Sequence, residues 1–356
     1  MFPFSAIVGQ EDARLALAIA AVDPGIGGVL LSGMKGTGKS TLVRSFPEIL
    51  PDQEVAEDCD YGCLADSFRY ACAECRKRIE KEGSLKSVTR RPSLVNVPLG
   101  VTEDRLLGTI DVEKLLQKGI TEFQPGLMAR ANNQVLYVDE VNLLPDNITD
   151  DVLDACASGR NTVEREGVSV THPAGFILVG TMNPEEGNLR PQIMDRFAMC
   201  VDVVTEMDPS KRMEIIKRVL AWESDQERFE KKFGKSDLKL RKVISAARSR
   251  LPAVKIPLHI IQNVAEAMAQ LEVDGQRPDL VTIRAAAAWS ALEDREEVEA
   301  EALEAVAPLC VCHRTRSGGM NQPPERKELL EVLQKYRKKK GSGEYFDTET
   351  VFTESG

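Results

Sequence analysis

The feature that most constrains this chain is an apolar run that passes directly into a glycine-rich loop, GVLLSGMKGTGKST at residues 28–41. It fits the pattern G-x-x-x-x-G-K-[ST], which requires a strand before the loop and a helix after it. Backbone N–H groups of such a loop close around phosphate oxygens, and its lysine reaches the outer phosphates. The predicted phosphate-binding residues are Gly33, Lys35, Gly36, Thr37, Gly38, Lys39, Ser40 and Thr41.

Short β-rich runs alternate with helical stretches up to about residue 205. These runs are GGVLLSG, SLVNVP, NQVLYVDEV, GFILVGTMN and FAMCVDVV. Their alternation with helices is typical of a parallel sheet that is covered by helices on both faces. We therefore predict an α/β nucleotide-binding domain at residues 1–205, with a five-stranded parallel sheet.

The second half of the chain has a different pattern. From Asp208 onward, apolar residues recur every three or four positions, which predicts an all-helical lid domain at residues 206–318. Asp208 and Pro209 suit a helix start, because aspartate caps the first turn and proline is tolerated within it. Residues 319–356 are predicted to form one more helix and a mobile tail.

Two further β-rich runs end in polar residues that ATP hydrolysis requires. LYVDE delivers Asp139, predicted to hold Mg²⁺ together with Ser40, and Glu140, predicted to be the general base for water. FILVGTMN delivers Asn183 to the same edge of the sheet, where its amide can polarise that water. The alternatives are a solvated strand end for the two acids and an ordinary turn residue before Pro184 for Asn183.

Arginines complete the predicted site. Arg196, in LRPQIMDRF, is predicted to reach the γ-phosphate of a neighbouring subunit as an arginine finger, with a surface ion pair to Asp195 as the alternative. Arg277, at the start of an alanine-rich helix, is predicted to sense the phosphate within its own chain, and Arg284 is the second candidate for that role.

The eight cysteines fall into two groups. Cys59, Cys63, Cys72 and Cys75 lie in the loop after the P-loop helix, where they could form a four-cysteine zinc site, remain reduced surface thiols or act as a redox switch. Zinc is thus a third candidate cofactor beside ATP and Mg²⁺. The other cysteines are predicted to be small buried residues, and no histidine is predicted to be a ligand.

Composition limits the partners and the location. A net charge of −10 and only 5% aromatic residues disfavour nucleic acid as the main partner. The N-terminal segment has no basic leader, and no apolar run is long enough to span a bilayer. We therefore expect a cytoplasmic protein with reduced thiols and no membrane partner.

The longer motifs resemble the I subunit of magnesium chelatase over roughly residues 2–316. They include VPLGVTEDRLLGTIDVEKLL, FQPGLMARANNQVLYVDEVNLL and ASGRNTVEREGVSVTHPAGFILVGTMNPEEGNLRPQIMDRF. The resemblance implies an AAA+ fold with two additions, an insert at Gly108 to Gly126 and a β-hairpin in NTVEREGVSVTHPA. This chain departs from the family at Arg160, where an aromatic residue is usual, at Met182, where a small one is, and in the charged tail after residue 318.

The same resemblance implies a function and partners. It implies an ATP-hydrolysing motor that forms a homo-oligomeric ring, a hexamer, and works with an integrin-domain AAA+ D-type subunit. A separate large subunit would hold the tetrapyrrole, protoporphyrin IX for example, and Mg²⁺ would be inserted there. The alternatives are a cobalt or nickel chelatase motor, or a MoxR-like remodelling ATPase that matures a partner protein.

Overall fold

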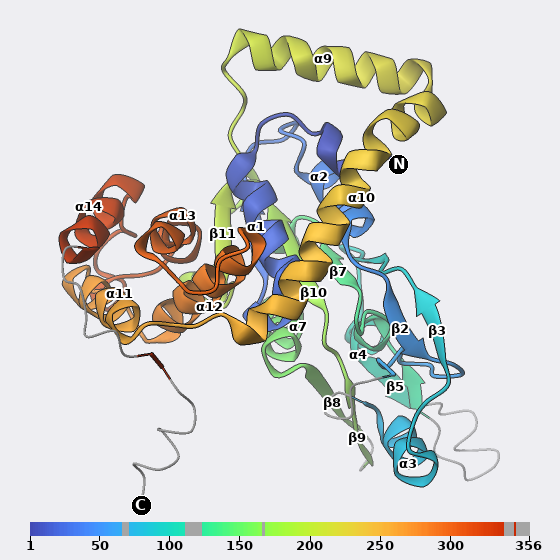
Figure 1. The fold of residues 1–356 in the computed structure, drawn as a ribbon. Coiled ribbons are helices and arrows are strands. Elements are labelled where there is room, and N and C mark those ends of the chain that lie inside the picture. Colours follow the sequence, from blue (N-terminus) through green and yellow to red (C-terminus); the bar gives the residue numbers. More distant parts are fainter. Residues whose placement is uncertain (66–70, 111–122, 166–167, 338–344, 347–356) are drawn as a thin grey trace, which may run out of the picture.

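A central sheet with helices on both faces, a helical bundle beside it and a projecting arm make up the protein (Figure 1). The structure is a computed structural model that describes residues 1–65, 71–110, 123–165, 168–337 and 345–346. In that part of the chain, no helix is both long enough and apolar enough to cross a membrane.

The central sheet has five strands, and every neighbouring pair in it is parallel. Each predicted β-rich run forms one strand, so the predicted α/β fold with a five-stranded parallel sheet is confirmed. In spatial order the strands are β11 (Met199–Asp202), β1 (Val29–Ser32), β10 (Ile177–Met182), β7 (Val135–Val138) and β4 (Leu94–Val97).

Alternate strand residues point to opposite faces of this sheet and enter two separate apolar clusters. Val29 and Leu31 pack on one face, whereas Leu30 packs on the other. The first face is covered by α1 (Glu11–Val22), α2 (Lys39–Ser45), α10 (Gln226–Arg250), α12 (Arg277–Leu292) and α13 (Ala300–Val311). The second face is covered by α4 (Glu103–Leu107), α6 (Leu127–Arg130), α7 (Asp146–Ser158) and α8 (Pro191–Met194).

The part of the chain after β11 is helical, as predicted. Its remaining helices are α9 (Pro209–Ser224), α11 (Leu258–Gln270) and α14 (Arg326–Arg337). The Asp208 side chain accepts a hydrogen bond from the Ser210 N–H and so caps α9. The apolar core of this helical region is continuous with the first face of the sheet. The domain limits at residues 205 and 318 stay a prediction, and most of the predicted tail lies outside the described residues.

Two antiparallel pairs correspond to the inserts that the resemblance implied. β8 (Arg160–Arg165) pairs with β9 (Val168–Pro173), and β5 (Gly108–Ile110) pairs with β6 (Phe123–Pro125). The hairpin turn at 166–167 and the insert at 111–122 lie outside the described residues.

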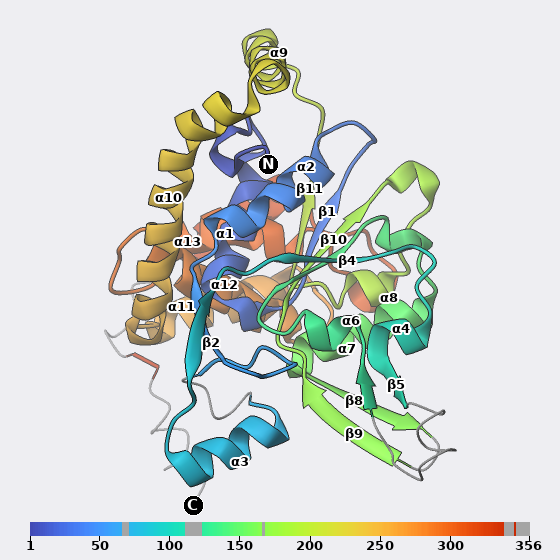
Figure 2. The ribbon, with the colours of Figure 1, turned by 90° about the vertical axis from the view of Figure 1, so that its right-hand side faces the viewer.

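The projecting arm is the part of the chain between α2 and β4. It consists of the antiparallel strands β2 (Gln53–Ala56) and β3 (Ser87–Arg90), and α3 (Ala73–Glu82) lies in the connection between them. Figures 1 and 2 both place α3 at the same end of the molecule as the β8–β9 hairpin.

Candidate active site

The carboxyl ends of β1, β10 and β7 lie side by side, because the strands are parallel and in register. Ser32 is paired with Met182, and Gly180 is paired with Val138. The residues that follow these strands therefore meet at one edge of the sheet. They are the P-loop after β1, Asp139 and Glu140 after β7, and Asn183 after β10.

The P-loop has a backbone that depends on glycine at three positions. Gly36 and Gly38 have φ angles of +83° and +86°, in the left-handed region that side chains disfavour. A Cβ atom on Gly33 would lie 2.2 Å from the Val203 carbonyl oxygen. The loop then enters α2, so the N–H groups of a helix N-terminus stand beside it, as phosphate binding requires.

Lys39 is positioned by the loop itself. Its side chain is only 6% exposed, and its Nζ donates to the carbonyl oxygens of Gly33 at 2.5 Å and Met34 at 2.8 Å and to Asn183 Oδ1 at 2.9 Å. Burial lowers the pKa of Lys39, while the nearby charges of Asp139, Glu186 and Glu140 oppose that shift. The ammonium is thus directed at the strand ends rather than at solvent.

The two acids after β7 are held through Thr181. Its hydroxyl donates to Asp139 Oδ1 at 2.6 Å and accepts from the Glu140 backbone N–H at 3.3 Å. Glu140 itself has φ +52°, a strained conformation that the surrounding contacts maintain. Strain of this kind is typical of residues that a site holds in one orientation.

Asn183 joins the lysine to the acids. While its Oδ1 accepts from Lys39, its Nδ2 donates to Glu140 Oε1 at 3.4 Å and to Glu186 Oε2 at 3.1 Å. The structure thus brings Lys39, Asp139, Glu140 and Asn183 together, as predicted, and adds Glu186, which the sequence analysis missed although it lies in NPEE directly after β10.

The residues present suit Mg²⁺ and a nucleoside triphosphate. Ser40 and Asp139 offer the oxygen ligands that Mg²⁺ prefers. Both are linked to the buried Tyr137, whose hydroxyl interacts with the two side chains and whose pKa is raised to about 12 by burial. The Asn183 to Glu140 bridge could orient a water for attack on a phosphate that the loop holds.

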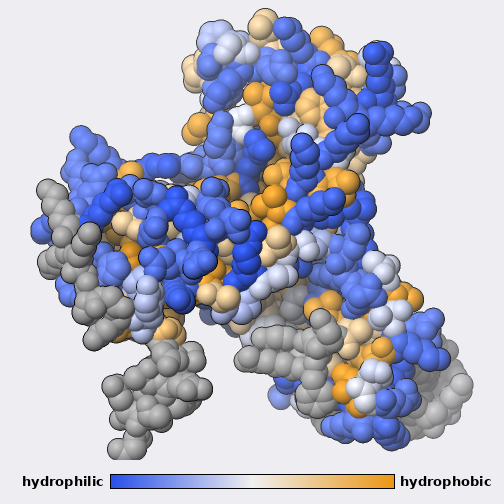
Figure 3. All heavy atoms as spheres, in the orientation of Figure 1, coloured by the Kyte–Doolittle hydropathy of each residue, from blue (hydrophilic) through white to orange (hydrophobic). Residues whose placement is uncertain are grey.

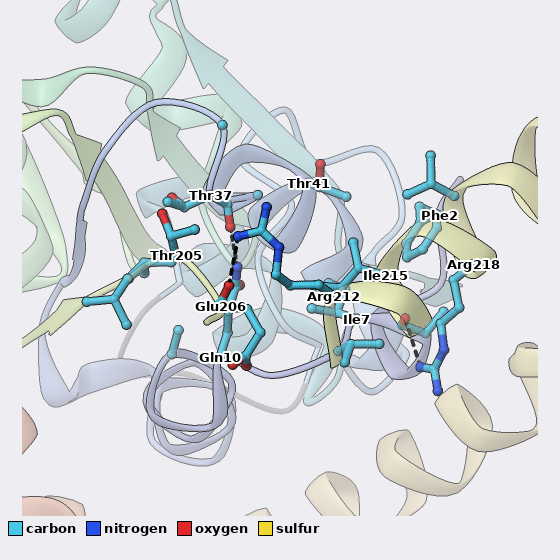
Figure 4. Close-up of a pocket in the computed structure, with 18 of the residues that line it drawn as sticks. Phe2, Ile7, Gln10, Thr37, Thr41, Thr205, Glu206, Arg212, Ile215 and Arg218 are labelled. Atoms are coloured by element: carbon cyan, nitrogen blue, oxygen red, sulfur yellow. Dashed lines mark hydrogen bonds between the residues drawn. The ribbon is translucent and has the colours of Figure 1, made fainter. Parts of the chain in front are cut away.

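A cavity of about 870 Å³ opens beside the P-loop (Figure 4). Its walls come from four regions: the N-terminal segment, the P-loop with α2, β11 with the residues that follow it, and α9. The Gln10 side chain donates a hydrogen bond to the Thr37 carbonyl. Representative lining residues are Ile7 and Gln10 from the N-terminal segment, Thr37 and Thr41 from the P-loop region, and Arg212 and Ile215 from α9. The role of α9 as a wall was not predicted, because its sequence gives only a helical period.

Arg196 lies at the opposite edge of the sheet from Lys39. The turn that carries it precedes β11, and there the Ala198 N–H donates to the Gly28 carbonyl at 2.9 Å, at the amino end of β1. A four-residue strand, roughly 13 Å long, separates the two edges. The Arg196 side chain is 36% exposed and pairs with Asp154 at 2.8 Å and Asp150 at 3.1 Å, not with Asp195.

Arg314, which the sequence analysis missed, holds the Arg196 turn in place. Its side chain is fully buried and donates to the carbonyl oxygens of Asp195, Phe197 at 2.8 Å and Ala198 at 3.3 Å. The neighbouring His313 ring contacts the Phe197 carbonyl at 3.3 Å. Burial lowers the pKa of His313 to about 3, and the charge of Arg314 adds to that shift.

The two lid arginines do not reach the P-loop edge. The charge of Arg277 acts on His313 and Arg314, which places it near the Arg196 turn. Arg284 forms a bidentate ion pair with Asp23 at 2.8 and 2.9 Å, just before β1. The predicted sensing role of Arg277 within its own chain stays a prediction, and this geometry gives it no support.

The four cysteines of the arm do converge. Their sulfur atoms all lie within 4.8 Å of one another. Hydrogen bonds from Cys63 and Cys72 lower the pKa of the Cys59 thiol, whereas burial raises the pKa of Cys75 to about 12. Cys156 and Cys310 are buried and Cys200 and Cys312 are partly buried, and all eight cysteines are free thiols.

Comparison with known proteins now identifies the family. The family model "Magnesium chelatase, subunit ChlI" matches residues 3–71 and 109–207, and "AAA lid domain" matches residues 261–334. The chain is 42% identical over 333 residues to the ChlI subunit of Nephroselmis olivacea, covering 94% of each protein. It belongs to the magnesium-chelatase ChlI family. The chain is therefore an AAA+ ATPase, as the resemblance implied.

A further ChlI relative and the solved structure of a BchI–BchD complex agree with this assignment, and a second solved structure shares the fold. A ChlI homologue of Methanocaldococcus jannaschii is 44% identical, with 94% of this chain and 90% of the relative covered. A cryo-EM-based structure of a complex between the BchI and BchD subunits of magnesium chelatase matches at 41% identity and TM-score 0.51, covering 94% of this chain and 99% of its own. A crystal structure from Cytophaga hutchinsonii, at 16% identity and TM-score 0.58, shares the fold.

Proposed function

We propose that this ChlI family member is the ATP-driven motor subunit of a metal chelatase that inserts a divalent metal, Mg²⁺, into a tetrapyrrole such as protoporphyrin IX. The observation that carries the proposal is the linked set of Lys39, Asn183 and Glu140 at the carboxyl edge of the sheet, in a chain that is 42% identical to a magnesium-chelatase subunit. The linked residues support ATP hydrolysis, and the relatives support its coupling to metal insertion.

The chain's own residues divide the work of hydrolysis. Lys39 and the loop N–H groups would bind the phosphates, and Ser40 with Asp139 would hold Mg²⁺, which neutralises charge on the transferred phosphoryl group. Glu140 would accept the proton of the attacking water, and the Asn183 amide, 3.4 Å from the Glu140 carboxylate, would keep that carboxylate aimed. Adenine and ribose would occupy the cavity between the P-loop and α9.

We propose that Arg196 completes the site of a neighbouring subunit. Its turn is at the amino edge of the sheet and its side chain is partly exposed beside α7, so a ring could present it to the next P-loop. Arg277 lies near the same amino edge of the sheet. Any contact that it made with a nucleotide would therefore also be with the nucleotide of the neighbouring subunit. A closed ring, a hexamer, supplies one such interface per subunit.

The proposed partners are an integrin-domain D-type subunit and a large tetrapyrrole-binding subunit. The solved complex of a BchI relative with BchD supports the first. In this scheme the metal that is inserted is a substrate of the large subunit, and no porphyrin site is expected on this chain.

Reconstitution tests this function. The chain would be mixed with candidate D-type and large subunits, protoporphyrin IX, ATP and Mg²⁺, Co²⁺ or Ni²⁺ in turn, and metalloporphyrin formation followed by absorbance. We expect ATP-dependent insertion of Mg²⁺ that disappears with the Glu140→Gln chain. Insertion of Co²⁺ or Ni²⁺ but not Mg²⁺ would show that the chelatase uses a metal other than the one proposed. ATPase stimulation by an integrin-domain partner without insertion of any metal would contradict the chelatase function and favour remodelling of a partner protein.

A further inference from the structure

The arm between β2 and β3 carries four cysteine sulfurs that point toward one another. Cys59 and Cys63 follow β2, and Cys72 and Cys75 stand at the start of α3. The Cys59 and Cys72 sulfurs are 3.9 Å apart, and all four lie within 4.8 Å of one another. Tetrahedral zinc with Zn–S bonds of 2.3 Å requires sulfurs about 3.8 Å apart. The arrangement is thus close to that of a tetrahedral four-sulfur site.

The backbone around the cluster favours thiolates. The Cys72 N–H donates to the Cys63 sulfur at 3.2 Å, and the Cys75 N–H donates to the Cys72 sulfur at 3.4 Å. Such outer hydrogen bonds stabilise and orient metal-bound sulfur. Cys72 is also the N-cap of α3, a ten-residue helix whose N-terminal dipole favours negative charge.

One basic residue on α3, Arg78, also favours negative charge on the cluster. The Arg78 guanidinium lies within electrostatic range of Cys75 and Cys59. Four thiolates around one Zn²⁺ carry a net charge of −2, which a nearby cation stabilises. The Arg78 charge is therefore compatible with a metal thiolate centre at this place.

The arm has too little apolar material to hold itself together. Its buried cluster consists of five small residues, of which three are cysteines: Ala56, Cys63, Ala71, Cys72 and Cys75. Segments with so small a core usually need disulfides or a metal to fold. Two disulfides need only two separate sulfur pairs, whereas here four sulfurs converge on one place. A single ion with four ligands accounts for that convergence.

We propose that Cys59, Cys63, Cys72 and Cys75 bind one structural Zn²⁺ that holds the two ends of the arm's loop together. All four coordination positions are filled by sulfur, so the site is closed and has no place for a substrate. The family match leaves residues 72–108 uncovered, so two of the four ligands lie outside the part of this chain that the family model matches.

The zinc would order a surface that the β8–β9 hairpin uses. Between the first two ligands, the Tyr61 ring stacks on His172 of β9, with centroids 5.5 Å apart. Side chains just before β7 hold the same turn, since Asn132 donates to the Tyr61 carbonyl at 2.9 Å and Asn133 to the Gly62 carbonyl at 3.0 Å. Loss of the metal would therefore loosen the base of the hairpin as well as the arm.

Metal analysis of the full chain tests the proposal. Protein purified without chelator and without added zinc should contain about one Zn²⁺ per chain by mass spectrometry of the metal. Cys63→Ser and Cys75→Ser should lose it, while the control Cys312→Ser, at a partly buried cysteine outside the arm, should retain it. Exchange of Zn²⁺ for Co²⁺ in the wild-type chain should give the intense visible bands of tetrahedral cobalt thiolate.

Other outcomes would overturn the proposal. They are zinc-free protein with four thiols that titrate freely in the arm, disulfides among these cysteines by mass spectrometry, or iron with the absorption of an iron–sulfur cluster. If the serine variants fail to fold, the zinc content and the cobalt spectrum of the wild-type chain decide. Because neither readout depends on ATP hydrolysis, failure here leaves the proposed motor function untouched, and the reverse also holds.

Discussion

The two edges of the central sheet carry different halves of the proposed site and are built in different ways. At the carboxyl edge, strand register alone gathers the P-loop, Asp139 and Asn183. At the amino edge, the Arg196 turn is held by Arg314 and His313, which follow α13 in the helical region. One half therefore forms with the sheet, whereas the other depends on how the lid helices pack. If Arg196 acts on a neighbouring subunit, as we propose, the position of the lid should affect that neighbour's nucleotide more directly than the chain's own.

The first prediction removes the amino-edge charge. Arg196→Ala should still bind ATP, because the P-loop lies at the other edge, but hydrolysis should fall about 10³- to 10⁵-fold, the usual contribution of an arginine finger. Binding would be measured with a fluorescent nucleotide and turnover by phosphate release. Mixing Arg196→Ala with Lys39→Ala chains should restore part of the activity, because some interfaces then pair an intact P-loop with an intact finger.

Mixing also provides the control. If native mass spectrometry shows mixed rings and hydrolysis remains absent, Arg196 does not act on a neighbour. Arg190, which pairs with Asp146 at 2.7 Å and is more exposed, would then be the next residue to test.

The second prediction separates two functions at the carboxyl edge. Lys39→Ala should lose nucleotide binding, because the charge that meets the phosphates disappears. Glu140→Gln should bind ATP and retain it, with turnover reduced about 10²- to 10⁴-fold through loss of the base. Equilibrium binding and single-turnover hydrolysis distinguish the two variants. Near-normal turnover in Glu140→Gln would show that another group takes the proton.

The carboxyl edge could be predicted from sequence and the amino edge could not, for physical reasons. The residues after β1, β7 and β10 are adjacent because parallel strands end together, so their place follows from the strand pattern. The Arg314 position follows from tertiary packing between α13 and β11, and a basic residue in HRTR has no local pattern that marks it as fully buried. The same reason applies to Arg277. Its place at the start of a helix was predicted, but the residues that surround it depend on tertiary packing and were not.

The arm shows an intermediate case. The cysteine spacing allowed a metal site but left reduced thiols and a redox switch open, because spacing along the chain does not fix where sulfurs point. The fold closes β2 on β3 and so brings the two cysteine pairs together. The position of α9 beside the P-loop could likewise not be predicted, because a helical period in the sequence does not show where the helix packs. Figure 3 shows hydrophobic residues between α9 and the body of the protein. One residue of α9 that lines the cavity, Ile216, is 58% exposed.

The third prediction concerns the contact that fixes the amino edge. Arg314→Met should lower the free energy of unfolding by roughly 3 kcal/mol, because several buried carbonyl groups lose a donor and each unmet group costs about 1–3 kcal/mol. Urea unfolding measures this. As a control, Arg337→Met removes an exposed arginine paired with Glu304 and should cost less than about 1 kcal/mol.

A second readout shows whether Arg314 is a positioning residue. In mixed rings, Arg314→Met chains should serve poorly as donors of Arg196 while still binding ATP themselves. Equal stability losses in the Arg314 and Arg337 variants, with normal donor activity, would contradict the role assigned to Arg314.

The fourth and smallest effect is the pH dependence that His313 should give to the same contact. Burial and the charges of Arg314 and Arg277 disfavour its imidazolium, so its folded pKa is about 3, whereas an unfolded histidine has a pKa of about 6.5. The unfolded chain therefore binds this proton more readily, and the stability from neutral His313, complete above pH of about 6.5, is lost as pH falls toward the folded value. At 1.36 kcal/mol per pH unit, the loss of stability between pH 7 and pH 5 is about 2 kcal/mol.

Urea unfolding of the wild-type chain and of His313→Gln at both pH values isolates this contribution, because all other titrating groups are common to the two proteins. We expect the variant to lose less stability on acidification, and an equal loss in both would mean that His313 is charged, or exposed to solvent, in the folded state.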